Sequence, residues 1–138
     1  MAGDAAQLIE LEHEARAALG ERRGGQRWLD THAARSDLWV EHIADRAVFV
    51  AVHDEMLVGY LVCSHADDIA RVEDVYVAPD WRDLGFGDAL LETAMADARA
   101  SRCVLIEGEA LPGDREIKNL YERAGVTARL IIVSRKLV

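Results

Sequence analysis

Cysteine is scarce in this sequence: the 138 residues include only two, with no Cys-x-x-Cys pair and no Cys/His cluster. The five histidines also fall at no spacing typical of metal ligands, so we expect no bound metal. Cys63 and Cys103 each lie inside an apolar run, which favours two small core residues over a disulfide or a reactive thiol.

Positive charge and long apolar runs are also lacking. The net charge is −9, whereas general nucleic-acid binding needs a basic surface. An acidic surface is compatible with amine-bearing substrates, although it more often serves solubility. No apolar run approaches the ~20 residues that span a bilayer, and the first residues lack a signal-peptide pattern. We therefore expect no nucleic-acid or membrane partner, and a cytoplasmic location.

What the sequence does contain is an ordinary globular balance, with 51% hydrophobic and 30% charged residues. Its length suits one domain over residues 1–138 with one core. Residues 5–19 have helical apolar spacing after a possible N-cap at Asp4, and a second helix is expected from about residue 30 to 44. Between them lies the basic, glycine-broken stretch ERRGGQRW, residues 21–28.

After residue 47 the pattern changes to β-branched and aromatic runs. Strands are expected at residues 47–53, 56–64, 69–77, 103–109 and 128–137, and helices at residues 86–99 and 115–124. The order α-α-β-β-β-α-β-α-β predicts an α/β fold with a mixed sheet.

Two glycines, Gly85 and Gly87, stand where the strand at 69–77 gives way to a helix, in VYVAPDWRDLGFGDALL. Unpaired N–H groups at a helix start favour an anion, and missing side chains let it approach. The alternative is that the glycines only permit a tight turn. A P-loop is excluded by the missing lysine, and a dinucleotide fingerprint is disfavoured because Leu90 occupies the third glycine position.

A longer run, VEDVYVAPDWRDLGFGDALLETA, resembles motif A of the GNAT superfamily of acyl-CoA-dependent N-acyltransferases. Farther on, GDREIKNLYERAGV resembles motif B of the same superfamily. The resemblance covers residues 45–138, which it implies form the acyl-CoA-binding core, with residues 1–44 as a helical acceptor-side segment. It implies a mixed, largely antiparallel central sheet with helices on both faces.

The first strand usual in this family is apparently absent, because a helix starts almost directly at Asp4. Without this strand the sheet has an exposed edge, which a neighbouring subunit could cover, so we expect a homodimer.

By the resemblance, the turn at residues 82–87 cradles the pyrophosphate of coenzyme A, and the backbone of the preceding strand pairs with the pantetheine amides. The thioester would lie between splayed parallel strands at 69–77 and 103–108. Motif B often starts with an asparagine, but Asp114 stands here, which suits an N-cap, and Asn119 is a doubtful substitute. The implied acetyl-CoA-binding residues are Val75, Val77, Arg82, Gly85, Phe86, Gly87, Asp88, Ala89 and Asn119.

The motif B tyrosine is commonly the general acid in this family, and Tyr121 occupies its position. The alternative is a tyrosine that only packs on the sheet. Four carboxylates are candidates for the base: strand alternation sends Glu73 and Asp74 to opposite faces, and Glu107 and Glu109 to the same face. Glu107 is the first choice by resemblance, with a water relay or merely solvated carboxylates as alternatives.

The resemblance thus implies an N-acetyltransferase that moves the acetyl group directly from acetyl-CoA to a primary amine. Arg22, Arg23 and Arg27 would lie over the mouth of the cleft, where an anionic acceptor, the coenzyme A nucleotide or a solvated loop each explain them. The alternative function is a non-catalytic acyl-CoA-binding or regulatory module. A nucleotide-binding oxidoreductase fragment is disfavoured by Leu90 and the short chain.

Overall fold

The computed structural model describes residues 2–45 and 47–138. The chain begins with α1 (Ala2–Leu19), α2 (Gly25–Thr31), the 3₁₀ helix η1 (Ser36–Leu38) and α3 (Trp39–Asp45). The helix expected over residues 30–44 is therefore two short helices. The Glu12 carboxylate accepts the backbone N–H groups of Arg35 (2.8 Å) and Ser36 (3.4 Å), and Ser36 has a φ of 46°. Both features break a continuous helix at this point.

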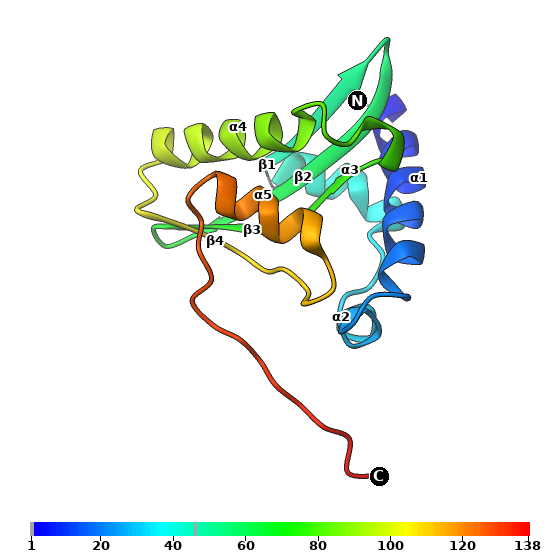
Figure 1. The fold of residues 1–138 in the computed structure, drawn as a ribbon. Helices are drawn as coiled ribbons and strands as arrows, with labels where there is room; N and C mark the ends of the chain where they lie inside the picture. The colour runs from blue at the N-terminus through cyan, green and yellow to red at the C-terminus, as the bar shows by residue number, and fades with distance from the viewer. Residues whose placement is uncertain (1, 46) are drawn as a thin grey trace.

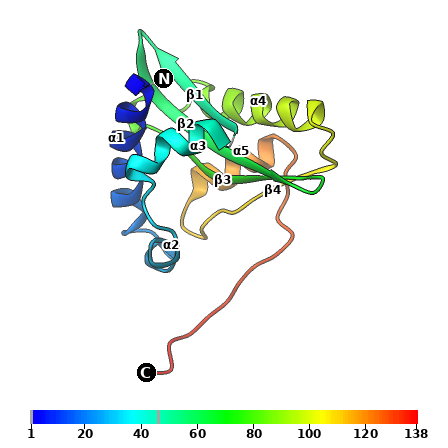
Figure 2. The same cartoon turned by 180° about the vertical axis from the view of Figure 1, so that it is seen from behind.

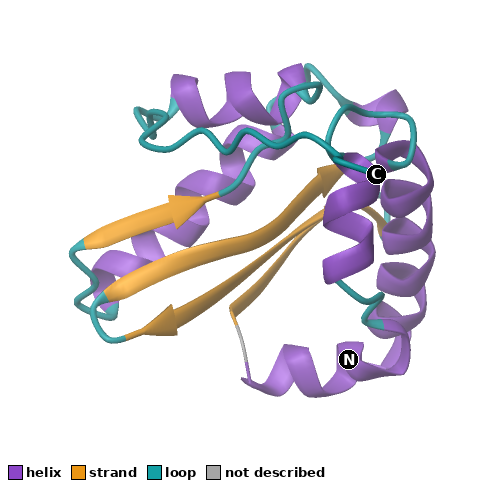
Figure 3. Cartoon of the chain, turned by 90° about the horizontal axis from the view of Figure 1, so that it is seen from below, coloured by secondary structure: helices purple, strands orange, loops and turns teal. Residues whose placement is uncertain are grey.

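The sheet has the order β1-β2-β3-β4, with strands β1 (Ala47–His53), β2 (Met56–Ala66), β3 (Ile69–Val77) and β4 (Leu105–Gly108) (Figures 1 and 3). The first three strands are antiparallel neighbours, and β4 lies parallel to β3. The turn residues Asp54 and Glu55 both have positive φ, as a tight hairpin requires. This confirms the mixed, largely antiparallel sheet.

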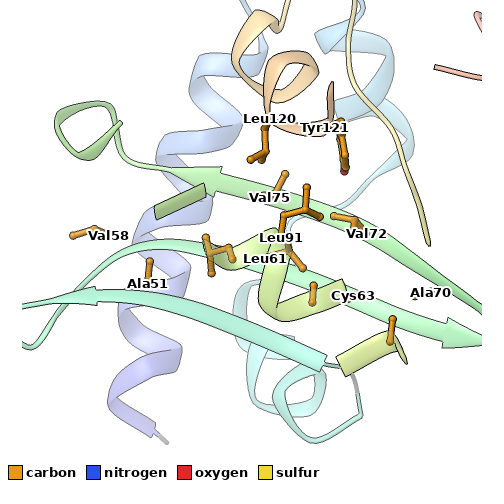
Figure 4. Packing of buried hydrophobic residues seen from close by; sticks show 13 residues of the cluster. Ala51, Val58, Leu61, Cys63, Ala70, Val72, Val75, Leu91, Leu120 and Tyr121 are labelled. Atoms are coloured by element: carbon orange, nitrogen blue, oxygen red, sulfur yellow. The ribbon is translucent and has the colours of Figure 1, made fainter. Parts of the chain in front are cut away.

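Helices cover both faces of the sheet, as expected (Figures 1 and 2). On one face, α1 and α3 pack Leu8 and Trp39 against Tyr60 of β2. On the other lie α4 (Phe86–Ala100) and α5 (Arg115–Arg123), where Leu91 meets Leu61 (Figure 4). Cys63 is buried in this second core, Cys103 packs against it, and both are free thiols, which confirms their expected structural role. None of the described helices is both long and apolar enough to cross a membrane.

A bulge interrupts β3 at Glu73. Val62 of β2 pairs with Asp74, but the next residue, Cys63, pairs with Val72, so Glu73 has no opposite residue. Val72 and Val75 consequently face the same core, three positions apart (Figure 4).

The prediction that Glu73 and Asp74 point to opposite faces is therefore wrong. Asp74 is hydrogen-bonded to Arg35, and Glu73 lines a hollow together with Arg35 and His42, so both carboxylates face the side of α2 and α3.

The two parallel strands separate immediately after this bulge. Their pairing ends at Val72 with Gly108, and β3 continues to Val77 without β4 beside it. The splay expected between these strands is thus present.

The expected last strand at residues 128–137 is wrong. After α5 the chain continues as an extended tail that forms no strand and runs away from the body (Figures 1 and 2). The apolar pattern of this segment is typical of a strand, but a strand also needs a neighbour, which the described residues of the same chain do not provide.

Candidate functional site

A cleft of about 380 Å³ opens where β3 leaves β4. Its walls are the end of β3, the first turn of α4, the inner side of α5 and the C-terminal part of α1. Of the nine residues implied to bind acetyl-CoA, eight line this cleft: Val75, Val77, Arg82, Gly85, Phe86, Gly87, Asp88 and Asn119.

The first turn of α4 contributes Gly85, Phe86, Gly87 and Asp88 to the lining of this cleft. Gly85 is the N-cap, with φ 88°, a left-handed conformation that favours glycine. Ala89 is not among the lining residues. Its N–H donates to the Gly85 carbonyl at 3.0 Å, so the N–H groups of Phe86, Gly87 and Asp88 come before the first hydrogen bond of the helix.

The space in front of this turn comes from Gly87. A Cβ added there would lie 3.5 Å from Leu120 and 3.8 Å from Val77, which is ordinary contact distance. The fold itself therefore does not require a glycine at this position. What the missing side chain does provide is room in the cleft in front of the helix start, as an anionic group would need.

The open edge of β3 presents backbone groups to the same cleft. The Ala78 N–H donates to Val58 of β2 at 2.8 Å. Because alternate residues of a strand direct their backbone groups to opposite sides, those of Val75 and Val77 point away from β2. The Val77 carbonyl is already used, since it accepts from Arg82 Nε at 2.8 Å.

Arg82 braces the turn more than it faces solvent. Its Nε also lies 2.9 Å from Glu116 of α5, and its guanidinium lies over the Tyr76 ring, 5.5 Å from the centroid. The side chain, which lines the cleft, therefore joins the end of β3 to α5.

Tyr121 comes from α5, and its ring lies against Gly108, the last residue of β4. A Cβ on Gly108 would overlap its hydroxyl, so the phenol occupies this place only because residue 108 is glycine. Burial raises the pKa of Tyr121, and the charges of Asp74 and Glu109 add to the rise. The phenol therefore stays protonated at neutral pH.

The candidate carboxylates separate clearly in space. Asp74 and Glu109 line the cleft with Tyr121, whereas Glu107 is not among the lining residues and pairs with Arg71 at 3.1 Å. Glu109 lies 3.8 Å from the same arginine. Glu73 accepts a hydrogen bond from Ser64 and lines a second hollow of about 360 Å³. That hollow shares Trp28, Val72 and Glu109 with the cleft.

The sequence reasoning missed a buried polar network behind the cleft. Arg35 Nη1 donates to Glu12 at 2.7 Å and to Asp74 at 3.1 Å, and the Tyr60 hydroxyl donates to the same Asp74 oxygen at 2.8 Å. Trp39 Nε1 donates to Glu12 at 3.3 Å. Burial raises the pKa of Asp74, while Arg35 and the Tyr60 hydroxyl oppose that rise. No local motif joins these residues, so only their pairing in space identifies them.

At the mouth of the cleft, the basic stretch contributes one charge rather than three. Arg22 lines the cleft, donates to the Gly113 carbonyl at 3.1 Å and lies 4.0 Å from Asp114. Arg23 and Arg27 are exposed and are not among the lining residues. Asp114 accepts the Ile117 N–H at 3.3 Å, which confirms it as the N-cap of α5.

Comparisons with known proteins agree with this architecture. A model of the acetyltransferase (GNAT) domain family matches residues 44–127. None of the curated proteins compared with the sequence matches it significantly.

Three solved structures show the same fold. An aminoglycoside acetyltransferase from an uncultured soil metagenomic sample, in complex with sisomicin, has a TM-score of 0.71 at 17% identity, covering 99% of this chain and 90% of its own. A ribosomal-protein-alanine N-acetyltransferase from Brucella melitensis biovar Abortus 2308 has a TM-score of 0.69 at 19% identity, covering 97% and 94%. An aminoglycoside N-acetyltransferase in complex with CoA has a TM-score of 0.62 at 18% identity, covering 75% and 88%.

The family match spans well over half of the chain and contains both the glycine turn and Tyr121. The chain therefore belongs to the GNAT acetyltransferase family.

Proposed function

We propose that this protein is an N-acetyltransferase that transfers the acetyl group of acetyl-CoA directly to a primary amine. One observation carries the proposal: a single cleft joins the glycine turn at the start of α4 to the phenol of Tyr121, between the separated ends of β3 and β4. An anion site at one end and a proton donor at the other are what such a transfer needs.

The residues present fit an acyl-CoA. The N–H groups of Phe86, Gly87 and Asp88 would hold the pyrophosphate, in the space that the missing side chain of Gly87 leaves open. The backbone of Val75 and the N–H of Val77 would pair with the pantetheine amides, because both face the open edge of β3. Bound acetyl-CoA would supply the acetyl group that is transferred, with its carbonyl carbon activated by the thioester.

Transfer forms one C–N bond and breaks one C–S bond, and protons must move at both ends. Tyr121, kept protonated by burial, would donate its hydroxyl proton to the departing sulfur. The base accepts the proton that the attacking amine loses. Glu107 stays the candidate from the family resemblance, but cleft geometry favours Asp74 or Glu109, directly or through water, because these two line the cleft.

The acceptor would enter from the second hollow, which meets the cleft at Trp28, Val72 and Glu109. Carboxylates of Glu73 and Glu109 on its walls suit an amine, and Arg22 at the cleft mouth is available to an anionic part of the acceptor. The solved relatives named for aminoglycosides and for a ribosomal protein alanine also act on amines, which supports the same acceptor class.

Two assays test the proposal. Acetyl-CoA should raise the thermal midpoint of unfolding, with NADH or ATP giving much smaller shifts, and no stabilisation by any acyl-CoA would refute it. Thiol release from acetyl-CoA is then followed against a panel of small amines, amino acids and peptides. Stabilisation by acetyl-CoA with no thiol release for any amine would instead support a non-catalytic acyl-CoA-binding module, which Asp114 in place of the motif B asparagine mildly favours.

A further inference from the structure

An ion pair joins α4 to α5 at the end of the cleft that holds the glycine turn; the two helices lie on the same face of the sheet (Figure 1). Arg123 Nε lies 3.0 Å from the Asp88 carboxylate, and both residues line the cleft. Their side chains are 57% and 49% exposed, so the pair meets solvent and can open without disturbing either helix. The contact uses one N–H donor of the guanidinium, which leaves its other donors for a second acceptor.

Carboxylates outnumber arginines at this end of the cleft. Its charged lining residues, among those the structure describes, are Arg82, Asp83, Asp88, Glu116 and Arg123. Arg82 is already paired with Glu116 at 2.9 Å. An anion bound here would therefore depend on the helix N–H groups and on the positive charge of Arg123, which Asp88 now neutralises.

Asp88 places a negative charge beside the N–H groups that would hold the pyrophosphate. It lies in the first turn of α4, after the Gly85 cap, and its own N–H is one of those groups. A carboxylate at this position is stabilised by the positive end of the helix dipole. A bound pyrophosphate needs the same positive end and would be repelled by that carboxylate. The side chain and the ligand thus make opposing demands on one helix start.

We propose that Asp88 limits the affinity for the acyl donor, because its carboxylate competes with the pyrophosphate for the start of α4 and for the Arg123 guanidinium. On binding, Arg123 exchanges the Asp88 carboxylate for a pyrophosphate oxygen, an acceptor that suits a guanidinium equally well. When coenzyme A leaves after transfer, Asp88 takes Arg123 back, which favours product release. This inference rests on the proposed function, since it concerns the same donor site.

Isothermal titration of the full chain with coenzyme A tests the competition. Asp88→Asn should tighten Kd about five- to tenfold, because it removes the repulsion and releases Arg123. Arg123→Gln should weaken Kd about tenfold or more, because a charged hydrogen bond to the pyrophosphate is lost. Glu92→Gln and Arg115→Gln are the matched controls: both residues are exposed, lie on the same two helices and are not among the cleft-lining residues. These controls should stay within about twofold of wild type.

Thermal unfolding without ligand separates competition from a purely structural ion pair. Asp88→Asn should slightly lower the unfolding midpoint of the free protein, because it loses both the pair and the interaction with the helix dipole. The same variant should nevertheless bind coenzyme A more tightly. Dephospho-coenzyme A keeps the pyrophosphate and lacks only the 3′-phosphate, so Asp88→Asn should tighten its binding by a similar factor.

Unchanged or weaker coenzyme A binding by Asp88→Asn would overturn this inference and leave the proposed function standing. Tightening that is absent with dephospho-coenzyme A would overturn it as well, because the pair would then act on the 3′-phosphate. A wild type that binds no coenzyme A would refute the proposed function and this inference together.

Discussion

Replacing Gly87 with valine gives the most direct test of the glycine turn. The Cβ site lies 3.5 and 3.7 Å from the Leu120 methyl groups and 3.8 Å from Val77. One added methyl group is therefore accommodated without movement, and Gly87→Ala should leave the free energy of unfolding unchanged or raise it by up to about 1 kcal/mol. Valine places two further methyl groups in the same space, in front of the first turn of α4.

The expected loss in affinity follows from the hydrogen bonds at that turn. If valine removes one bond from a helix N–H to a charged oxygen, binding weakens by about 1.5–3 kcal/mol, or roughly 10- to 150-fold in Kd. Gly87→Ala should fall between wild type and Gly87→Val, because it fills less of the space.

Isothermal titration with coenzyme A measures these affinities directly. Ala96→Val is the control, since it adds a β-branched residue to an exposed position of the same helix, away from the cleft. Equal Kd values for wild type and Gly87→Val would refute the role given to this turn. Equal weakening by Ala96→Val would show that helix stability, and not space, explains the effect.

Three further predictions concern α5 and the polar network behind the cleft. Tyr121→Phe should lower kcat for thiol release by about 10²- to 10⁴-fold with unchanged coenzyme A affinity; an unchanged kcat would exclude the acid role. Because burial raises the pKa of Tyr121, the wild-type rate should show no loss from its ionisation below about pH 10. Arg35→Met should lower the free energy of unfolding in urea at pH 8 by about 3–5 kcal/mol, since it leaves the carboxylates of Glu12 and Asp74 without their positively charged partner. Without Arg35 the folded-state pKa of Asp74 rises further above its unfolded value, so this loss should shrink as the pH falls and Asp74 takes up a proton; a loss independent of pH would contradict the network. Asp114→Ala should lower stability by about 1 kcal/mol through the lost N-cap, whereas Asp114→Asn should retain most of it; equal losses for both would show that the cap is not responsible.

The features predictable from the sequence were those encoded by neighbouring residues. The hairpin, the strand before Pro79 and the glycine turn each follow from local backbone preferences. The N-cap at Asp114 and the core positions of both cysteines could be inferred in the same way. Tyr121 was found because it lies within a contiguous motif.

The features that were missed depend on contacts between distant residues. Glu12, Arg35, Tyr60 and Asp74 are spread over more than sixty positions. Only Asp74 was a candidate from the sequence, and its partners have no sequence signal of their own. The long helix expected around Arg35 is broken because the Glu12 carboxylate takes backbone N–H groups that a helix would use. The last strand was expected from its composition alone, although a strand also needs a neighbouring strand with which to pair.

The bulge at Glu73 links the buried network to the open cleft. Had β3 alternated strictly, Asp74 would share the face of Val72 and lie in the apolar core below α4 and α5. A carboxylate there would lack partners and cost several kcal/mol. The extra residue, Glu73, turns Asp74 toward Arg35 and Tyr60. Glu73 also follows directly after Val72, the last residue of β3 that pairs with β4. One local irregularity thus satisfies a buried charge and accompanies the separation of β3 from β4, which leaves β3 backbone free for a ligand.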